Sequence, residues 1–337
     1  MSYEYQLVVE FKEKQKDVLY EGPSWYTAKI VDQISIAKHR IVIRFMRAAK
    51  IDPQAYLFTK SSPVRIQLYR AACFYLAVTG ALPGVKKVCL KSAQGDMELD
   101  KERLTQHWAN CRIDLTMPAG VAARCFRQHG KTCYVAITYF LKAQLDSFPH
   151  DCFRAAWSGV NAIYSHLVSP EVQDEHVKLD ALRNRIENSL MADSTTFVGS
   201  LPDSFWHDVN WGLFVKAGMS RRKNRIDHIL DQNGYKEALI YDKLVEAFCR
   251  ERKKDCPDIV AHLQKEHARR MQGRKRDPKA EMVFFVTEYC YMLRNRSFHA
   301  VRPYPIFDLF DESGNSTEAL LTKLLLYVIR DLLAETI

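Results

Sequence analysis

Polar residues near the end of the chain have side chains suited to proton transfer and to phosphate binding. Arg294, Asn295 and His299 lie within the stretch LRNRSFHAV at residues 293–301, and Arg296 stands between them. Histidine takes up and releases protons near neutral pH. The arginine fork binds phosphate oxygens through paired N–H groups, and an asparagine beside it can orient the imidazole or hold the phosphate. These residues therefore predict acid–base chemistry at a bound oxyanion.

The helix that must position these residues has clear signals at both ends. Asp277 is suited to the N-cap, and Pro278 then occupies the first helical position. Pro303 and Pro305 require the helix to end near His299. Apolar residues repeat along one face at helical spacing: Met282, Phe285, Val286, Tyr289, Cys290 and Leu293.

A straight helix distributes the polar residues unevenly around its axis. Asn295 and His299 project about 40° apart, whereas Arg294 and His299 project about 140° apart. Arg296 projects onto the apolar stripe, where a guanidinium must be paired or must line a cleft or interface. We therefore expect a homodimer in which two copies of this helix place their Arg294 and His299 side chains around one cleft.

Residues 1–125 are expected to form a small mixed α/β domain. Apolar and polar residues alternate over residues 3–11, which predicts a strand. Residues 64–84 predict a helix, and residues 86–100 predict two short strands. Residues 30–49 fit either a helix or strands.

Residues 126–337 are expected to form a mainly helical domain, so that the fold class is α+β. Helices are predicted at 133–146, 150–168, 179–190, 237–253, 257–270 and 316–334. Asn315 and Glu318 have the spacing of a capping box for the last helix. Residues 193–275 are more broken and are expected to be an insertion or elaboration of the helical domain.

Composition limits the cellular setting. The net charge of +9 is compatible with a polyanionic partner but does not demonstrate one. The nine cysteines contain no CxxC pair, which favours reduced core cysteines of a cytosolic protein. The N-terminus has no signal-peptide pattern, and no stretch reaches the ~18 apolar residues of a membrane span. We expect a cytoplasmic protein without membrane contact.

The spacing Arg294-Asn295-x3-His299 resembles the Arg-polar-x3-His motif of the HEPN superfamily, which lies late in a helical bundle. The segment FRAAWSGVNAIYSHL, at residues 153–167, is similar to an early helix of that superfamily. Residues 316–334 lie where such a bundle would close. The resemblance covers roughly residues 130–337 and leaves the N-terminal domain without a counterpart.

The resemblance implies a metal-independent endoribonuclease that needs no cofactor and acts as a homodimer on RNA. It also implies a phage-defence or toxin–antitoxin setting, with an antitoxin or another defence protein as a further partner. In such an enzyme the 2′-OH of the RNA attacks the phosphate. Arg294 and Asn295 would then hold the phosphate, and His299 would move a proton.

Basic clusters in the same half of the chain add candidate RNA contacts. They lie at residues 220–225, 250–254 and 268–276. The predicted substrate-binding residues are Arg269, Arg270, Arg274, Lys275 and Arg276, together with Arg296. Each cluster taken alone also fits a solvated surface, whereas phosphate contacts would make RNA binding strongly dependent on salt.

Other interpretations of the helix end remain. Basic residues in a last helical turn complement the helix dipole by about 0.3–1 kcal/mol each without doing any chemistry. A bundle of this kind also serves as a non-catalytic dimerisation module or as a nucleotide- or protein-binding adaptor. A DNA-binding regulator is less favoured because no helix-turn-helix pattern with a basic recognition helix occurs.

Overall fold

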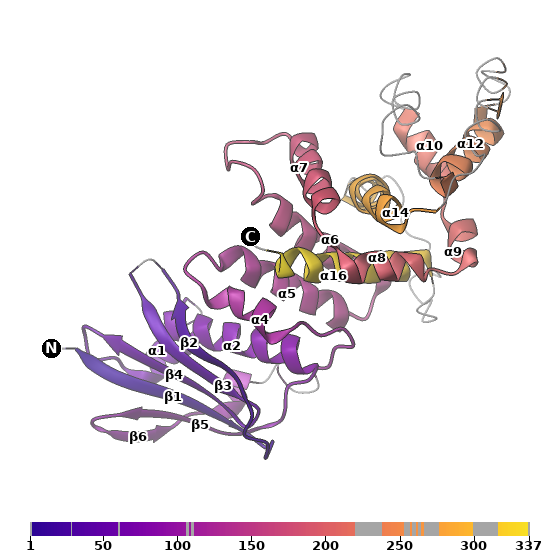
Figure 1. Cartoon of the computed structure of the whole chain (residues 1–337). Helices are drawn as coiled ribbons and strands as arrows, with labels where there is room; N and C mark the ends of the chain where they lie inside the picture. Colours follow the sequence, from indigo (N-terminus) through magenta and orange to yellow (C-terminus); the bar gives the residue numbers. More distant parts are fainter. Residues whose placement is uncertain are drawn as a thin grey trace. The chain divides into compact units, whose positions relative to one another are not determined.

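The chain folds into two compact units, which the computed structural model in Figure 1 displays. Unit 1 spans Met1–Ser147 and unit 2 spans Phe148–Ile337. The boundary therefore follows Ser147 rather than residue 125. The residues described are 2–27, 29–59, 61–105, 108, 111–219, 238–252, 257, 261, 264–265, 276–298 and 316–335.

Unit 1 is built on an antiparallel sheet of six strands in the order β2-β3-β4-β1-β5-β6. Its strands are β1 (Tyr3–Phe11), β2 (Val18–Trp25), β3 (Val31–Ala37), β4 (Arg40–Arg47), β5 (Val85–Ser92) and β6 (Gly95–Glu98). The predicted strand at 3–11 is confirmed as β1, which pairs with β4 and β5. The ambiguous segment 30–49 forms the hairpin β3–β4.

The alternation along β1 places its apolar side chains on one face of the sheet. Tyr5, Leu7, Val9 and Phe11 are all at most 3% exposed. Helix α2 contacts β3 and β4. Residues between these apolar ones are polar where they pair across the strands. Gln6 lies opposite Arg44 of β4 on one side and opposite Lys91 of β5 on the other.

Strand β2 lies at one edge of the sheet and contains Gly22 and Pro23. Local sequence preference predicts no strand here, because both residues are poor strand formers. An edge strand tolerates proline, since one side of its backbone needs no partner strand.

The helices of unit 1 are short except for two. They are α1 (Pro53–Phe58), α2 (Pro63–Thr79), α3 (Lys101–Thr105), α4 (Ala119–Ala122), the 3₁₀ turn η1 (Ala123–Phe126) and α5 (Lys131–Leu145). The predicted helix at 64–84 is confirmed as α2 and ends at Gly80, whose positive φ of 81° favours glycine. Helix α5 packs on α2 and η1, which explains why it belongs to unit 1.

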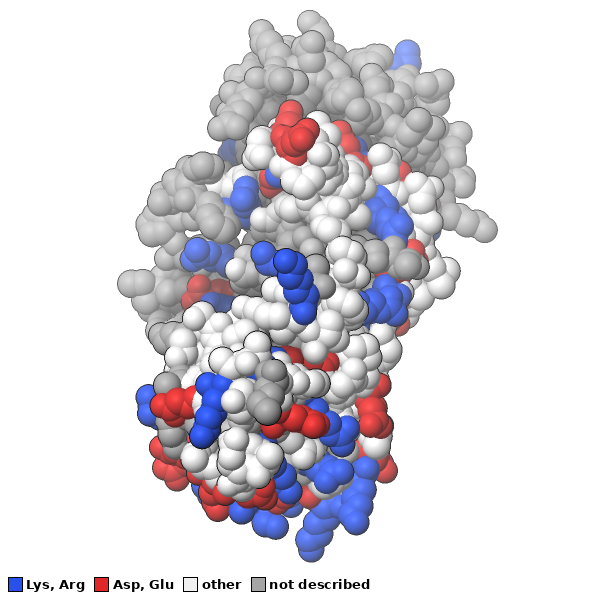
Figure 2. Space-filling view, turned by 90° about the vertical axis from the view of Figure 1, so that its left-hand side faces the viewer, with Lys and Arg blue, Asp and Glu red and all other residues white. Residues whose placement is uncertain are grey.

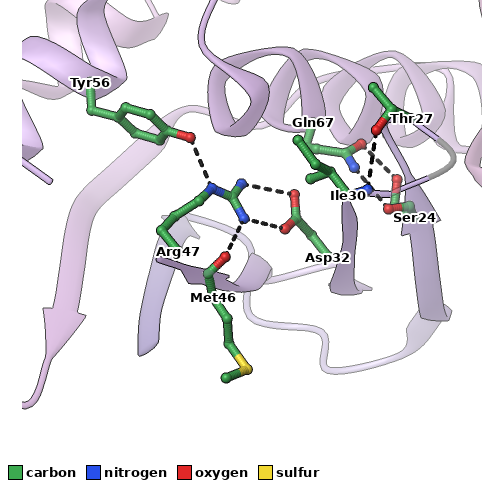
Figure 3. A network of polar contacts seen from close by, with 8 residues as sticks. All are labelled: Ser24, Thr27, Ile30, Asp32, Met46, Arg47, Tyr56 and Gln67. Atoms are coloured by element: carbon green, nitrogen blue, oxygen red, sulfur yellow. Dashed lines mark hydrogen bonds and ion pairs between the residues drawn. The ribbon is translucent and has the colours of Figure 1, made fainter. Parts of the chain in front are cut away.

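A buried polar network ties α1 to the sheet of unit 1, as Figure 3 shows. The Asp32 side chain is fully buried, and its Oδ1 lies 3.0 Å from Nη1 of Arg47. Arg47 Nε also donates to the Tyr56 hydroxyl in α1 at 2.9 Å. Nearby, Ser24 in β2 donates to Oε1 of Gln67 in α2 at 2.6 Å. A buried carboxylate needs such partners, because its desolvation is otherwise costly.

Unit 2 is helical throughout the residues that the structure describes. Its elements are α6 (Pro149–Tyr164), α7 (Glu175–Asn188), α8 (Ala192–Gly199), α9 (Asp203–Asp208), α10 (Trp211–Met219), α12 (Ala238–Arg252), α14 (Pro278–Phe284), the π-helical turn η3 (Phe285–Tyr289), α15 (Cys290–Phe298) and α16 (Thr317–Ala334). The α+β class is thus confirmed.

The helices of unit 2 form a bundle around α16 and α6. Helix α16 packs along α6 and α8, while α14 packs on α7 and α8 and α15 packs on α6. The expected elaboration at 193–275 therefore includes α8, which packs along α16, and α9, whose Phe205 ring lies 5.2 Å from that of Phe285. Helix α10 packs on α12 and joins the rest through Phe214, whose ring lies 5.2 Å from that of Phe284.

Helix α16 starts one residue later than its capping box predicts. Ser316, rather than Asn315, is the N-cap, and its hydroxyl accepts a hydrogen bond from the backbone N–H of Ala319 at 3.2 Å. Asn315 itself lies outside the described residues. Among the residues that the structure does describe, no helix combines the length and the apolar character of a membrane span.

Candidate functional site

The helix that carries Arg294 and Asn295 begins as the sequence predicts. Asp277 is its N-cap and accepts hydrogen bonds from the backbone N–H groups of Lys279 and Ala280, at 3.0 and 3.2 Å. The predicted stripe is buried from Met282 to Cys290. The side chains of Glu281, Val283, Phe284 and Thr287 are buried as well, so the first turns are enclosed on nearly every side.

The helix is not straight, because Phe285–Tyr289 forms a π-helical turn. A side chain of α7 and a backbone group between α9 and α10 form hydrogen bonds with this turn. Arg183 in α7 donates to Oε1 of Glu288 at 2.5 Å, and the Tyr289 hydroxyl accepts from the backbone N–H of Asn210 at 3.1 Å. Within the turn, the Thr287 hydroxyl donates to the backbone oxygen of Val283 at 2.9 Å.

The π-turn changes which residue faces the bundle. Such a turn holds one residue more than an α-turn, so the residues after it are rotated by about 100° from a straight-helix projection. Arg294 thereby takes the place on the stripe that a straight helix gives to Leu293. The side chain of Arg296, which a straight helix projects onto the stripe, lies outside the described residues. The Arg294 side chain is half-buried, and its Nε atom is inaccessible to solvent.

Arg294 and Asn295 contact each other directly. Nη1 of Arg294 donates to Oδ1 of Asn295 at 2.8 Å. An arginine has five N–H donors in a planar fork, and one of them is fixed by this amide oxygen. The contact orients the guanidinium at the last turns of α15.

Tyr291 lies one turn before Arg294 on this helix. Its ring is close to aromatic rings of α6 and of the first turn of α7. The Tyr291 ring lies 6.3 Å from that of Trp157 in α6 and 6.0 Å from that of His176 in α7. Arg294 and Asn295 follow Tyr291 by three and four residues and so share its face of the helix. The α7 turn and the arginine therefore lie on the same side of α15.

A buried tyrosine supplies the polar link between α6 and α7. The Tyr164 side chain is fully buried, and its hydroxyl donates to Oε1 of Glu175 at 2.5 Å. Burial raises the pKa of the Tyr164 phenol, and the hydrogen bond to the Glu175 carboxylate raises it further. The positive charge of Arg294 acts in the opposite direction on the same pKa.

Tyr164 lies in the helix predicted at 150–168, where the sequence pattern gives it no separate role. The signal for its partner was the tyrosine itself, because a buried phenol nearly always requires a hydrogen-bond partner. That partner, Glu175, lies on the next helix, and the packing of α7 on α6 brings it to the phenol.

The structure describes only some of the residues predicted for the site. Arg294 and Asn295 are described and lie together. His299, Arg269, Arg270, Arg274, Lys275 and the side chain of Arg296 lie outside the described residues. The basic cluster at 220–225 does so too. On the face that Figure 2 displays, lysine and arginine side chains are interspersed with aspartate and glutamate where the surface is described.

Arg276 is the one described residue of the basic segment 268–276, and it takes part in an intramolecular ion pair. Its Nε and Nη2 donate to the two carboxylate oxygens of Glu281 at 2.7 and 3.0 Å. Nη2 also donates to the backbone oxygen of Val198, and the guanidinium lies 5.0 Å from the centre of the Trp206 ring. These contacts indicate a structural role for Arg276 rather than the predicted phosphate contact.

Within the described part of the chain, no three histidine, cysteine, aspartate or glutamate side chains are grouped so as to hold a metal ion. What the described residues bring together is a guanidinium, an amide, a carboxylate, a buried phenol and an imidazole from three helices. Comparisons of the chain with protein-family models, with curated proteins and with solved structures found no match.

Proposed function

We propose that unit 2 is a HEPN-like, metal-independent endoribonuclease whose reaction centre lies at the end of α15. The 2′-OH of the RNA attacks the adjacent phosphate, and the strand breaks at the 5′-oxygen. Arg294 stabilises the charge that develops on the phosphorane, and Asn295 orients Arg294. His299 moves one of the protons.

The observation that carries this proposal is the position of Arg294. Its Nε atom is buried after the π-turn, Asn295 accepts a hydrogen bond from its Nη1, and its positive charge lowers the pKa of the buried Tyr164 phenol. An arginine that only complemented the helix dipole would need none of these contacts. A guanidinium fixed in one orientation is suited to stabilise charge on an oxyanion, because little reorganisation accompanies the reaction.

The resemblance adds the expected biological setting. We propose a homodimer that acts in phage defence or in a toxin–antitoxin pair, with RNA bound near the two copies of α15. The alternative function is a non-catalytic adaptor that uses the same bundle to dimerise and to bind a nucleotide or a protein. The contact between Arg294 and Asn295 fits this alternative as well, so an activity measurement must separate the two.

The test compares three purified proteins on total RNA in EDTA: wild type, Arg294→Ala and the control Arg154→Ala. Arg154 is an exposed arginine of α6 whose weak ion pair with Asp151 contributes little to stability. We expect cleavage by wild type and by the control, and a loss of at least about 10²-fold in Arg294→Ala. Intact RNA with the wild-type protein, together with dimer formation, would favour the adaptor.

A further inference from the structure

The sheet of unit 1 carries a small cavity on the face that lies opposite its buried core. Along β4, Ile43 and Phe45 are buried in the core, so Arg44 between them points to the other face. The cavity has a volume of about 60 Å³ and is lined by Glu21 of β2, by Gln33, Ile34 and Ser35 of β3, and by Val42 and Arg44 of β4.

The pairing of the strands explains why these side chains meet. Gln33 of β3 lies opposite Arg44, and Gln6 of β1 lies opposite Arg44 on its other side. In the next row, Glu21 of β2 lies opposite Ser35 of β3. Residues that lie opposite each other have Cβ atoms about 4.5–5.5 Å apart, so the members of each row are neighbours. A guanidinium between two amides and a carboxylate in the adjacent row therefore share one surface.

The charged side chains at the cavity have no partner within the part of the chain that the structure describes. Glu21, Gln33 and Arg44 are exposed, and none of their side chains forms a hydrogen bond or an ion pair with a described residue. Elsewhere on the same face, Lys87 of β5 pairs with Glu98 of β6 at 3.3 Å. The charges at the cavity are thus free to interact with a ligand.

The cavity combines one negative and one positive side chain, and this combination restricts the ligand. Glu21 repels a phosphate or a carboxylate, and Arg44 repels a metal ion or an ammonium group. An apolar group would desolvate both charges without compensating either. The complementary ligand is uncharged and has hydrogen-bond acceptors on one edge and donors on another.

Guanine has this pattern of acceptors and donors. Its O6 and N7 atoms accept hydrogen bonds from an arginine fork, and its N1–H and N2–H groups suit the two oxygens of a carboxylate. Adenine, cytosine and uracil lack this combination of two adjacent acceptors and two adjacent donor groups. A water molecule needs about 10–15 Å³ of such space, so the cavity admits the edge of a base. Its floor is apolar, because Val42 on the same face is only 3% exposed.

We propose that this cavity binds a guanine of single-stranded RNA, with Arg44 on O6 and N7 and Glu21 on N1–H and N2–H. The Gln33 amide offers a further hydrogen bond to the same base. The inference rests on the proposed function for its ligand, and it deepens that function, because unit 1 then selects the RNA on which unit 2 acts.

The test measures binding of the full-length protein to labelled oligonucleotides of 2′-O-methyluridine by fluorescence anisotropy. Each contains one guanine, one 7-deazaguanine, one hypoxanthine or no purine. These oligonucleotides have no free 2′-OH, so the proposed reaction does not consume them. Wild type should bind the guanine oligonucleotide about 10-fold more tightly than the one without a purine. Loss of N7 in 7-deazaguanine, or of the N2 amino group in hypoxanthine, should each weaken binding about 3-fold or more.

Three variants assign these losses to single residues. Arg44→Ala should no longer distinguish guanine from 7-deazaguanine, and Glu21→Ala should no longer distinguish guanine from hypoxanthine. The control is Arg40→Ala, because Arg40 is exposed on the same strand and the same face but does not line the cavity. It should keep the preferences of wild type. A structural role of Arg44 or Glu21 would not affect the response to one atom of the base, and circular dichroism reports whether each variant is folded.

The outcomes separate this inference from the proposed function, which cleavage of unmodified RNA tests. If wild type cleaves RNA but binds the oligonucleotides with and without guanine equally, the inference alone is overturned. It is also overturned if wild type binds none of the oligonucleotides, or if folded Arg44→Ala keeps the preference for guanine. A preference for guanine that depends on Arg44, in a protein that leaves RNA intact, supports the binding site and overturns the proposed cleavage.

Discussion

Arg276 and Glu281 form a doubly hydrogen-bonded ion pair in which the carboxylate is fully buried. The two N–O distances are 2.7 and 3.0 Å, and the Glu281 side chain has no exposed area. The pair joins the start of α14 to α8 through the backbone oxygen of Val198. Arg276 therefore has a structural role, whereas the other basic residues of the segment 268–276 are predicted to bind RNA. Substitutions of single residues can test the two roles separately.

The remaining basic residues of the segment are expected to contact RNA phosphates. Replacing Arg269, Arg270, Arg274 and Lys275 with glutamine should weaken RNA binding. It should also flatten the salt dependence, by about 0.7 in the log–log slope for each lost contact with a single strand. The measurement is the RNA affinity at several salt concentrations. If the slope does not change, the segment is only a solvated surface.

Arg276→Ala is the contrasting variant, and it should reduce stability instead. Removal of the guanidinium leaves the Glu281 carboxylate buried without its partner, which costs about 3–5 kcal/mol. Urea denaturation should show this loss, and adding Glu281→Gln to the variant should recover part of it. A stable Arg276→Ala protein with a flatter salt slope would restore Arg276 to the RNA-binding set.

The buried pair in unit 1 leads to a second stability prediction. Arg47→Leu should destabilise the protein by about 3–5 kcal/mol, because Asp32 remains buried in a place without a countercharge. The double variant Arg47→Leu/Asp32→Leu removes both charges and should lie much closer to wild type. Thermal unfolding of the three proteins compares them directly. Equal losses in the single and double variants would show that the packing of Arg47, and not its charge, is what matters.

The carboxyl group of Asp331 should make the stability of the protein depend on pH. Burial raises the pKa of its carboxyl above the ordinary value, and hydrogen bonds from the backbone and hydroxyl of Ser194 lower it in part. A folded-state pKa above the unfolded one stabilises the protein at low pH, and this contribution is lost as the pH rises through the folded value.

The variant Asp331→Asn does not titrate, so it isolates this contribution. Its free energy of unfolding should rise relative to wild type between about pH 4 and pH 7. Urea denaturation of both proteins across that range measures the difference. A difference that stays constant with pH, or that falls, contradicts the raised pKa.

Local patterns in the sequence predicted much of the fold. The alternation in residues 3–11 and the Asp277 cap with Pro278 depend on near neighbours, and both are confirmed. Strand β2 was missed because its Gly22 and Pro23 oppose local strand preference. Gly22 and Pro23 instead pair with Ile34 and Gln33 of the neighbouring strand β3.

The candidate site was only partly predictable for the same physical reason. Arg294 and Asn295 were found from residue type and spacing. The π-turn before Arg294 forms hydrogen bonds with Arg183 of α7 and with the backbone of Asn210, which lie far away in the sequence. His176 reaches Tyr291 of α15 only through helix packing, so spacing along the chain carried no signal for it.

The homodimer is predicted because Arg294 and His299 project about 140° apart on a straight helix, so that one copy of the motif makes an incomplete site. We expect a dimer at micromolar concentration by light scattering. A heterodimer of Arg294→Ala and His299→Ala subunits, isolated with two affinity tags, should regain part of the cleavage activity if two subunits share a site. Two self-contained sites would regain none, and an active monomer would refute the shared-site arrangement.

The central claim is that the protein cleaves RNA at the end of α15 without a metal, and that the 2′-OH of the RNA itself attacks the phosphate. The most direct measurement uses a short RNA that the protein cuts in EDTA and a copy with 2′-deoxyribose at the scissile position. The account predicts that the RNA yields a 2′,3′-cyclic phosphate and a 5′-OH, that the deoxy copy stays intact at that position, and that Arg294→Ala cuts neither. Cleavage of the deoxy copy, a requirement for magnesium, or full activity of Arg294→Ala would contradict it.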